Sequence, residues 1–180
     1  MAMPISAPRY TVDDLDRFPA DGNRYEILGG MLLVTPAPAA PHQIVTLRLA
    51  SALLQYLKPF SNVYAASPGE VILAPMNRLE PDILVFQTLS PAESWEAFER
   101  WLAVEVASPS TRIYDRDFKR PAYLALGVRE FWRVEPRERT ITSSRQGSVE
   151  SVWRDRVTWQ PEAGRAPLVI DLGEIFQGLP

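Results

Sequence analysis

The stretch Trp101–Trp132, WLAVEVASPSTRIYDRDFKRPAYLALGVREFW, decides the fold of this chain. It opens with Trp101–Ala107, in which six of seven residues are apolar. An unbroken apolar run of this length is typical of a strand that is buried on both faces. The exception is Glu105, and a glutamate is almost never fully buried unless it is paired or bound to a cation. The run therefore predicts a core strand that carries a charged group with a specific partner.

The residues after this run predict a helix and a returning strand. Asp117–Leu126 is expected to be helical, with Gly127 as its left-handed end. Pro121 lacks an amide hydrogen and disfavours helical geometry at the preceding residue, so either the helix begins late or its first turn is irregular. Glu130–Glu135 predicts the next strand. A strand, a crossover helix and a second strand imply a parallel pair with a right-handed connection.

Most other segments predict antiparallel elements around this unit. Gly29-Gly30 joins two strand-like runs within residues 24–34, which is a hairpin signal because both glycines accept positive φ. His42–Leu57 predicts a helix that packs a broad apolar face on a sheet, with Leu47 and Leu54 on that face beside Leu49 and Leu53. The remaining segments are a short capped helix at 11–18, strands or a hairpin at 63–66 and 70–74, a strand at 82–86, hairpin strands at 139–144 and 148–153, and a strand at 167–172.

The expected fold class is α/β (α+β), with a central mixed β-sheet flanked by helices and extra β-hairpins near both ends. A chain of 180 residues that is 46% apolar can bury one real core. No linker is long enough to divide it, so residues 1–180 are expected to form a single domain. No apolar run approaches the roughly 20 residues needed to cross a bilayer, and the N-terminus lacks signal-peptide character. We expect a cytoplasmic protein without a membrane partner.

Composition restricts the chemistry. The chain has no cysteine and one histidine, which excludes thiolate catalysis and zinc sites built from cysteine or clustered histidine. Any metal must be held by oxygen. The net charge of −3 gives no overall bias toward nucleic acid, but residues 112–139 hold eight of the 19 basic residues against five acids. That local excess, which includes Arg112, could steer a phosphate-bearing substrate.

Two acids and one lysine form the candidate site. Asp82 directly precedes a strand, Glu105 lies within one, and Lys119 lies in the following helix. The chain has only two lysines, Lys58 and Lys119, and an ammonium can act as a compact donor of a kind that a guanidinium cannot provide. Each residue also has a simpler interpretation: a turn aspartate, a glutamate paired with an arginine, and a solvated lysine.

Several longer segments together resemble the Uma family of bacterial endonucleases, within the restriction-endonuclease-like superfamily that carries the PD-(D/E)xK pattern. They are, in chain order, RYEILGGMLLVTPAPAAPHQ (24–43), EPDILVF (80–86), VEVASPSTRIYDRDFKRPAYLALGVREFWRVEP (104–136) and PLVIDLGEIF (167–176). The resemblance implies a restriction-endonuclease-like core, with Asp82 and Glu105 as ligands of Mg²⁺ or Mn²⁺. Ala107 stands where the usual pattern places lysine, and the family instead takes its lysine from the next helix, which selects Lys119.

The resemblance also nominates residues around that centre. Glu26 matches a further acid of the family and could hold a second cation or a water, or could equally pair with Arg24 across an exposed strand. His42 stands in the family's usual place at the start of the long helix, where it could contact substrate or metal-bound water or be structural. The resemblance also suggests hydrogen-bond donors to phosphate, namely Ser108, Ser110 and Thr111, although these residues could instead only cap the next helix. Tyr123 could help fix Lys119 from the same helix face.

The expected function is metal-dependent hydrolysis of DNA phosphodiester bonds by a homodimer, since one site per chain must act twice to cut both strands. The alternative is a catalytically inactive nuclease fold that serves as a DNA-binding or assembly module. A weaker third candidate is hydrolysis of another phosphate ester, such as RNA. Replacing Asp82 or Glu105 by alanine is expected to abolish cleavage and to raise thermal stability, because removal of a carboxylate relieves repulsion among crowded acids.

Overall fold

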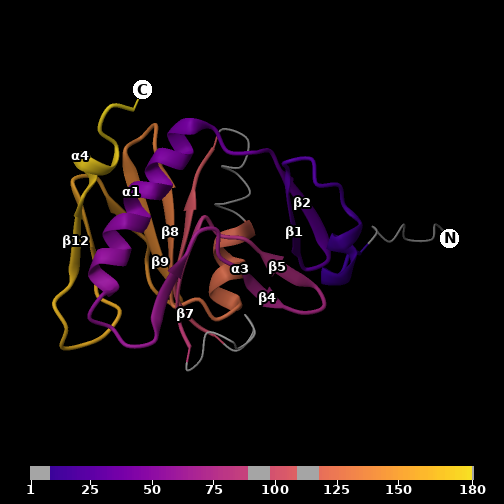
Figure 1. The fold of residues 1–180 in the computed structure, drawn as a ribbon. Coiled ribbons are helices and arrows are strands. Elements are labelled where there is room, and N and C mark those ends of the chain that lie inside the picture. Colours follow the sequence, from indigo (N-terminus) through magenta and orange to yellow (C-terminus); the bar gives the residue numbers. More distant parts are fainter. Residues whose placement is uncertain (1–8, 89–97, 109–117, 180) are drawn as a thin grey trace.

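A six-stranded mixed sheet lies at the centre of the computed structural model, which describes residues 9–88, 98–108 and 118–179 (Figure 1). Strands β7 and β8 run parallel, and every other neighbouring pair in this sheet is antiparallel. The parallel pair confirms the predicted strand, helix, strand unit. The order is β10 (Ser151–Trp153), β9 (Thr140–Arg145), β8 (Glu130–Glu135), β7 (Glu99–Val106), β6 (Ile83–Gln87) and β3 (Val63–Ala66).

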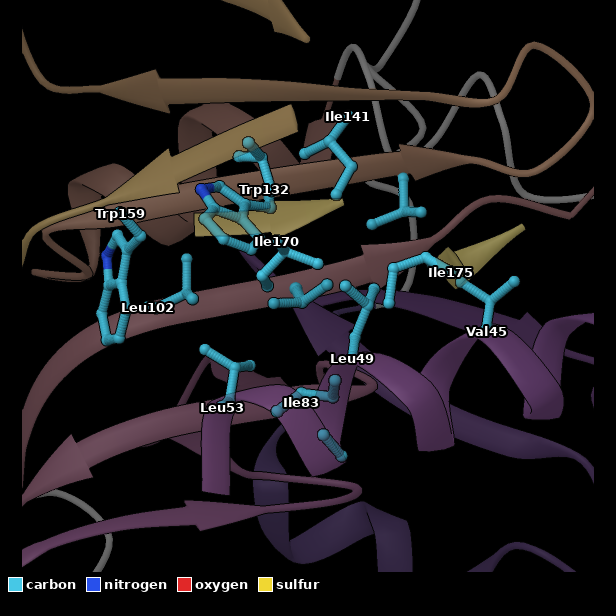
Figure 2. Packing of buried hydrophobic residues seen from close by; sticks show 14 of the residues in the cluster. Val45, Leu49, Leu53, Ile83, Leu102, Trp132, Ile141, Trp159, Ile170 and Ile175 are labelled. Carbon is cyan, nitrogen blue, oxygen red and sulfur yellow. The ribbon is translucent and has the colours of Figure 1, made fainter. Parts of the chain in front are cut away.

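One face of this sheet is covered by the long helix α1 (Ala40–Leu57), together with β11 (Arg156–Trp159), β12 (Leu168–Asp171) and α4 (Leu172–Ile175). Figure 2 shows Val45, Leu49 and Leu53 of α1 directed into this core. The prediction that Leu47 and Leu54 share the buried face is wrong, since they are 68% and 51% exposed. The helix is apolar on most of its circumference, so the spacing of its apolar residues alone could not select the buried stripe.

The opposite face packs against a second, four-stranded sheet and the short helix α3 (Arg120–Ala125), seen on the other side of β7 from α1 in Figure 1. A second apolar cluster joins the two sheets through residues such as Leu79, Leu84 and Tyr123. Pro121 lies in the first turn of α3, where its missing amide hydrogen costs nothing. The small sheet has the order β2 (Met31–Thr35), β1 (Arg24–Leu28), β5 (Asn77–Leu79) and β4 (Val71–Leu73).

The strands predicted at 63–66 and 70–74 exist but do not form a hairpin. Strand β3 pairs with β6 in the central sheet, whereas β4 pairs with β5, a strand that the sequence pattern did not predict. Between them Gly69 passes so close to β6 that a Cβ atom there would lie 2.2 Å from the Cβ of Leu84. The chain therefore crosses from one sheet to the other at a position where only glycine fits.

The N-terminal hairpin is confirmed. Strands β1 and β2 pair in register about Gly29 and Gly30, whose φ angles are +57° and +81°. The short helix before them is a 3₁₀ helix, η1 (Val12–Arg17), closed by a capping box between Thr11 and Asp14 and without a buried residue. Among the described residues, no helix combines the length and apolar character that crossing a bilayer requires.

Candidate active site

Asp82 and Glu105 lie side by side at the ends of two paired strands. The register of β6 against β7 pairs Ile83 with Val104, and Asp82 and Glu105 are the next residues in that register. The backbone N–H of Val106 donates to Asp82 Oδ2 at 2.8 Å, which ties the two strand ends together. Both carboxylates are 3% exposed. The fold thus brings together the two acids that the sequence placed on neighbouring strands.

Asp82 is held by two further side chains from other elements. Arg24 of β1 donates from Nη2 to Oδ1 at 3.0 Å, and His42 Nε2, in the first turn of α1, lies 3.0 Å from Oδ2. Burial alone would raise the pKa of Asp82, but the hydrogen bond and charge of His42, the charge of Arg24 and the Val106 amide outweigh it. The pKa of Asp82 therefore lies below its ordinary value, and the group is an anion.

Lys119 and Tyr123 meet Glu105 from the start of α3. The ammonium of Lys119 lies 3.0 Å from Glu105 Oε1, and the Tyr123 hydroxyl donates to the same oxygen at 2.7 Å. Tyr123 therefore fixes the glutamate that Lys119 faces. Burial raises the pKa of Tyr123 well above its usual value, and the charge of Glu105 adds to that effect. The interpretation of Lys119 as a solvated helix residue is wrong, since it is only 3% exposed.

Glu26 completes the group from β1. Its side chain is fully buried. Glu26 Oε2 lies 2.7 Å from the Lys119 ammonium, which is a close ion pair without the alignment of a hydrogen bond. Glu26 Oε1 accepts a hydrogen bond from the Glu80 amide at 2.8 Å. The alternative that Glu26 pairs with Arg24 across an exposed strand is wrong. The two residues are two apart on β1 and share a face, but each pairs with a different residue.

The buried charges do not cancel. Three carboxylates, Glu26, Asp82 and Glu105, face two permanent cations, Arg24 and Lys119. These five groups alone sum to one net negative charge, and Glu80, whose Oε2 lies 3.9 Å from Arg24 Nε, is a further acid beside them. The premise that these acids only repel one another is wrong, because each has a cationic partner: Arg24 for Asp82, and Lys119 for both Glu26 and Glu105. The predicted gain in thermal stability on removal of one carboxylate stays a prediction.

The phosphate-binding candidates after β7 are only partly placed. Ser108 is partly exposed, two residues beyond the end of β7. Ser110, Thr111 and Arg112 lie outside the described residues, so their predicted contacts stay predictions.

Arg24 is the residue of the site that sequence reasoning missed, since it was considered only as a partner for Glu26. Its Nη1 also donates to the carbonyl oxygen of Glu80 at 2.8 Å, so both prongs of the guanidinium are engaged. Its position two residues before Glu26 on one strand was the available signal, because such residues point to the same face.

A divalent cation fits the residue types at this centre. Among the residues with described positions, no three or more histidine, aspartate or glutamate side chains converge as a full metal cage. Mg²⁺ does not require one, because it is usually held by one or two carboxylates together with water and substrate phosphates. Asp82 and Glu105, which lie opposite each other where β6 and β7 pair, carry the hard oxygen donors that would suit such an ion.

Comparison with known proteins agrees with this architecture. A crystal structure from Anabaena variabilis ATCC 29413, described as a "putative nuclease", superposes with a TM-score of 0.73 over 92% of this chain and 97% of that chain. Sequence identity is 18%, so this similarity concerns the fold. No curated protein matches the chain. The model of the Uma2 family, described as "Putative restriction endonuclease", matches residues 12–175, and the chain therefore belongs to that family.

Proposed function

We propose that this protein is a Mg²⁺- or Mn²⁺-dependent endonuclease that hydrolyses phosphodiester bonds of DNA. The observation that carries the proposal is the convergence of Asp82, Glu105 and Lys119 in one buried cluster, with the ammonium 3.0 Å from Glu105 Oε1. These residues come from three different elements: Asp82 directly precedes β6, Glu105 lies in β7, and Lys119 lies at the start of α3. Family membership and a fold shared with a protein described as a nuclease support the same conclusion.

The roles follow from the chemistry of each group. Asp82 and Glu105 would hold the cation, and that cation would acidify a water and neutralise charge on the phosphoryl group. Lys119 would orient the attacking water through its ammonium, a compact donor with freely rotating hydrogens. Glu26 lies 2.7 Å from that ammonium, and Tyr123 bonds the glutamate it faces, so these two residues would set the position of Lys119.

His42 and the fold complete the proposal. His42 Nδ1 is buried and has no hydrogen-bond partner among the described residues, while Nε2 faces Asp82, so His42 would orient that carboxylate. The central mixed sheet with its crossover helix would represent the restriction-endonuclease-like core. We further propose a two-fold homodimer, because one site per chain must act twice to cut a duplex.

One observation favours the alternative of an inactive nuclease fold that binds DNA or assists assembly. Both oxygens of Asp82 already accept hydrogen bonds from within the protein, so the cluster holds together without a metal. Such a module would bind DNA with a steep salt dependence and would have no metal requirement.

The test combines calorimetric titration with Mn²⁺ and cleavage of supercoiled plasmid, linear duplex and single-stranded DNA. The proposal predicts Mn²⁺ binding and cleavage in the wild type, and loss of both in Asp82→Asn and Glu105→Gln. The matched control is Glu99→Gln, which makes the same change at the exposed end of β7 and should leave binding and cleavage intact.

Two outcomes would decide against the enzyme. Wild-type protein that binds no Mn²⁺ and leaves all three DNA substrates intact would favour the inactive module, and duplex binding without metal would then support it directly. Cleavage that persists in both variants would show that these carboxylates are not the metal ligands.

A further inference from the structure

Arg24 occupies Asp82, the carboxylate that the proposed function assigns to the metal. Its Nη2 donates to Oδ1 at 3.0 Å, while Nη1 is anchored on the Glu80 carbonyl at 2.8 Å. The guanidinium therefore stands as a fixed positive charge beside one of the two metal-ligand candidates.

The exposure of the two cations separates their roles. The side chain of Lys119 is 4% exposed, whereas that of Arg24 is 21% exposed and so reaches the solvent-facing side of the cluster. Lys119 instead lies between the buried carboxylates of Glu26 and Glu105. Arg24 is consequently the cation that can move aside without opening the core.

Repulsion gives the motion a driving force, because a divalent cation at Asp82 would share that carboxylate with Arg24. The guanidinium keeps a second carboxylate nearby when it moves, since Glu80 Oε2 lies 3.9 Å from its Nε and the Glu80 side chain is 19% exposed. Two cations that share one carboxylate in a poorly hydrated site repel each other strongly. Retreat of the guanidinium toward solvent relieves that repulsion.

We propose that Arg24 is the resident counter-cation of Asp82. In the cation-free protein the guanidinium neutralises and orients this carboxylate, and a divalent cation must displace the guanidinium in order to bind. The inference rests on the proposed function, because it assigns Asp82 to the metal. Arg24 is then a positioning residue whose removal strengthens metal binding. A residue that only supported the fold would weaken metal binding when removed.

The test is calorimetric titration of Mn²⁺ into Arg24→Met, Arg24→Lys and wild type. Arg24→Met removes the competing charge at similar length, so its Mn²⁺ dissociation constant should fall at least about tenfold, which corresponds to about 1.4 kcal/mol. Arg24→Lys keeps the charge and should bind with nearly wild-type affinity. Arg145→Met is the matched control, because Arg145 also pairs with a buried carboxylate, that of Glu130, and among the described residues it contacts neither Asp82 nor Glu80.

A change of fold is separated from this effect by melting each protein with and without Mn²⁺. A ligand that binds only the folded state stabilises it by RT ln(1 + [L]/Kd), so tighter binding gives a larger rise in melting temperature. The Mn²⁺-induced increase should therefore be larger for Arg24→Met than for wild type, even if the variant starts lower. Equal or weaker Mn²⁺ binding by Arg24→Met would overturn the proposal, as would equal tightening by Arg145→Met.

The two proposals fail in different ways. If wild type binds Mn²⁺ and Asp82→Asn does not, but Arg24→Met gains no affinity, then only the role of Arg24 is refuted. If neither wild type nor Arg24→Met binds Mn²⁺, then the metal site itself is refuted. Binding by Arg24→Met alone would support the displacement and would explain a silent wild type.

Discussion

Replacement of Lys119 by methionine should strongly destabilise the fold, because it removes the ammonium that pairs with both Glu26 and Glu105. The ammonium lies 2.7 Å and 3.0 Å from these carboxylates, and Coulomb's law at an effective dielectric constant of about 20 gives roughly 6 kcal/mol for each contact. Most of that attraction is offset by the desolvation of the ions. Experience with broken buried ion pairs indicates a net loss of about 3–5 kcal/mol in the free energy of unfolding.

The assay is urea unfolding followed by tryptophan fluorescence, which reports on a core that contains Trp101, Trp132 and Trp159. The matched control is Lys58→Met, the same change at the chain's other lysine, which is exposed at the end of α1. That control should stay within about 0.5 kcal/mol of wild type, as is usual for surface substitutions.

A second variant connects the loss to charge rather than to packing. Adding Glu26→Gln to Lys119→Met removes the carboxylate that was left unpaired, so the double variant should recover part of the lost stability. The reasoning is refuted if Lys119→Met has the same urea midpoint as wild type. It is also refuted if the double variant loses more free energy of unfolding than the two single variants lose together.

Three further substitutions test the packing and the protonation around the site. Tyr123→Phe should lower the free energy of unfolding by about 2 kcal/mol at neutral pH, since it removes a buried hydrogen bond to a charged group. Because the pKa of Tyr123 is raised in the folded protein, the unfolded phenol ionises first, and wild type should lose its advantage over this variant as the pH rises above 10.0. Equal dependence of the two stabilities on pH, measured by urea unfolding at alkaline pH, would contradict this. Leu53→Ala should cost about 2–5 kcal/mol and Leu54→Ala far less, because the first is fully buried and the second is 51% exposed, and similar urea midpoints would contradict the assigned helix face. Gly69→Ala should lower the melting temperature, since its new methyl would lie 2.2 Å from the Cβ of Leu84, and an unchanged melting curve would show that the strand crossing is not tight.

The core strand and its glutamate could be predicted because local sequence determines them. An apolar run interrupted by one acid leaves few structural options, and Glu105 indeed lies buried in β7. The parallel return through α3 to β8 follows from the same short stretch. These features depend on residues that are close together in the chain.

The partners of the charged residues could not be predicted in the same way. Arg24 meets Asp82 across 58 residues of sequence. Its place two residues before Glu26 indicates a shared strand face but not the acid that it contacts. The same limit explains why β3 and β4 were placed in one possible hairpin, because strand pairing depends on which sheet edge the chain reaches after Gly69. Helix α1 was ambiguous for a different reason, since it is apolar on most sides.

The enclosed group of five permanent charges has a consequence for how this fold could change over time. Ion clusters of this kind are often no more stabilising than well-packed apolar side chains of similar volume, so replacing the whole group together would leave the fold as stable or make it more so. Stepwise loss is uneven, because Lys119 keeps a carboxylate when Glu26 or Glu105 alone is lost, whereas loss of Lys119 leaves both carboxylates without it. Substitutions would therefore begin most easily at one of these two acids, and Lys119 would be among the last residues of the group to change.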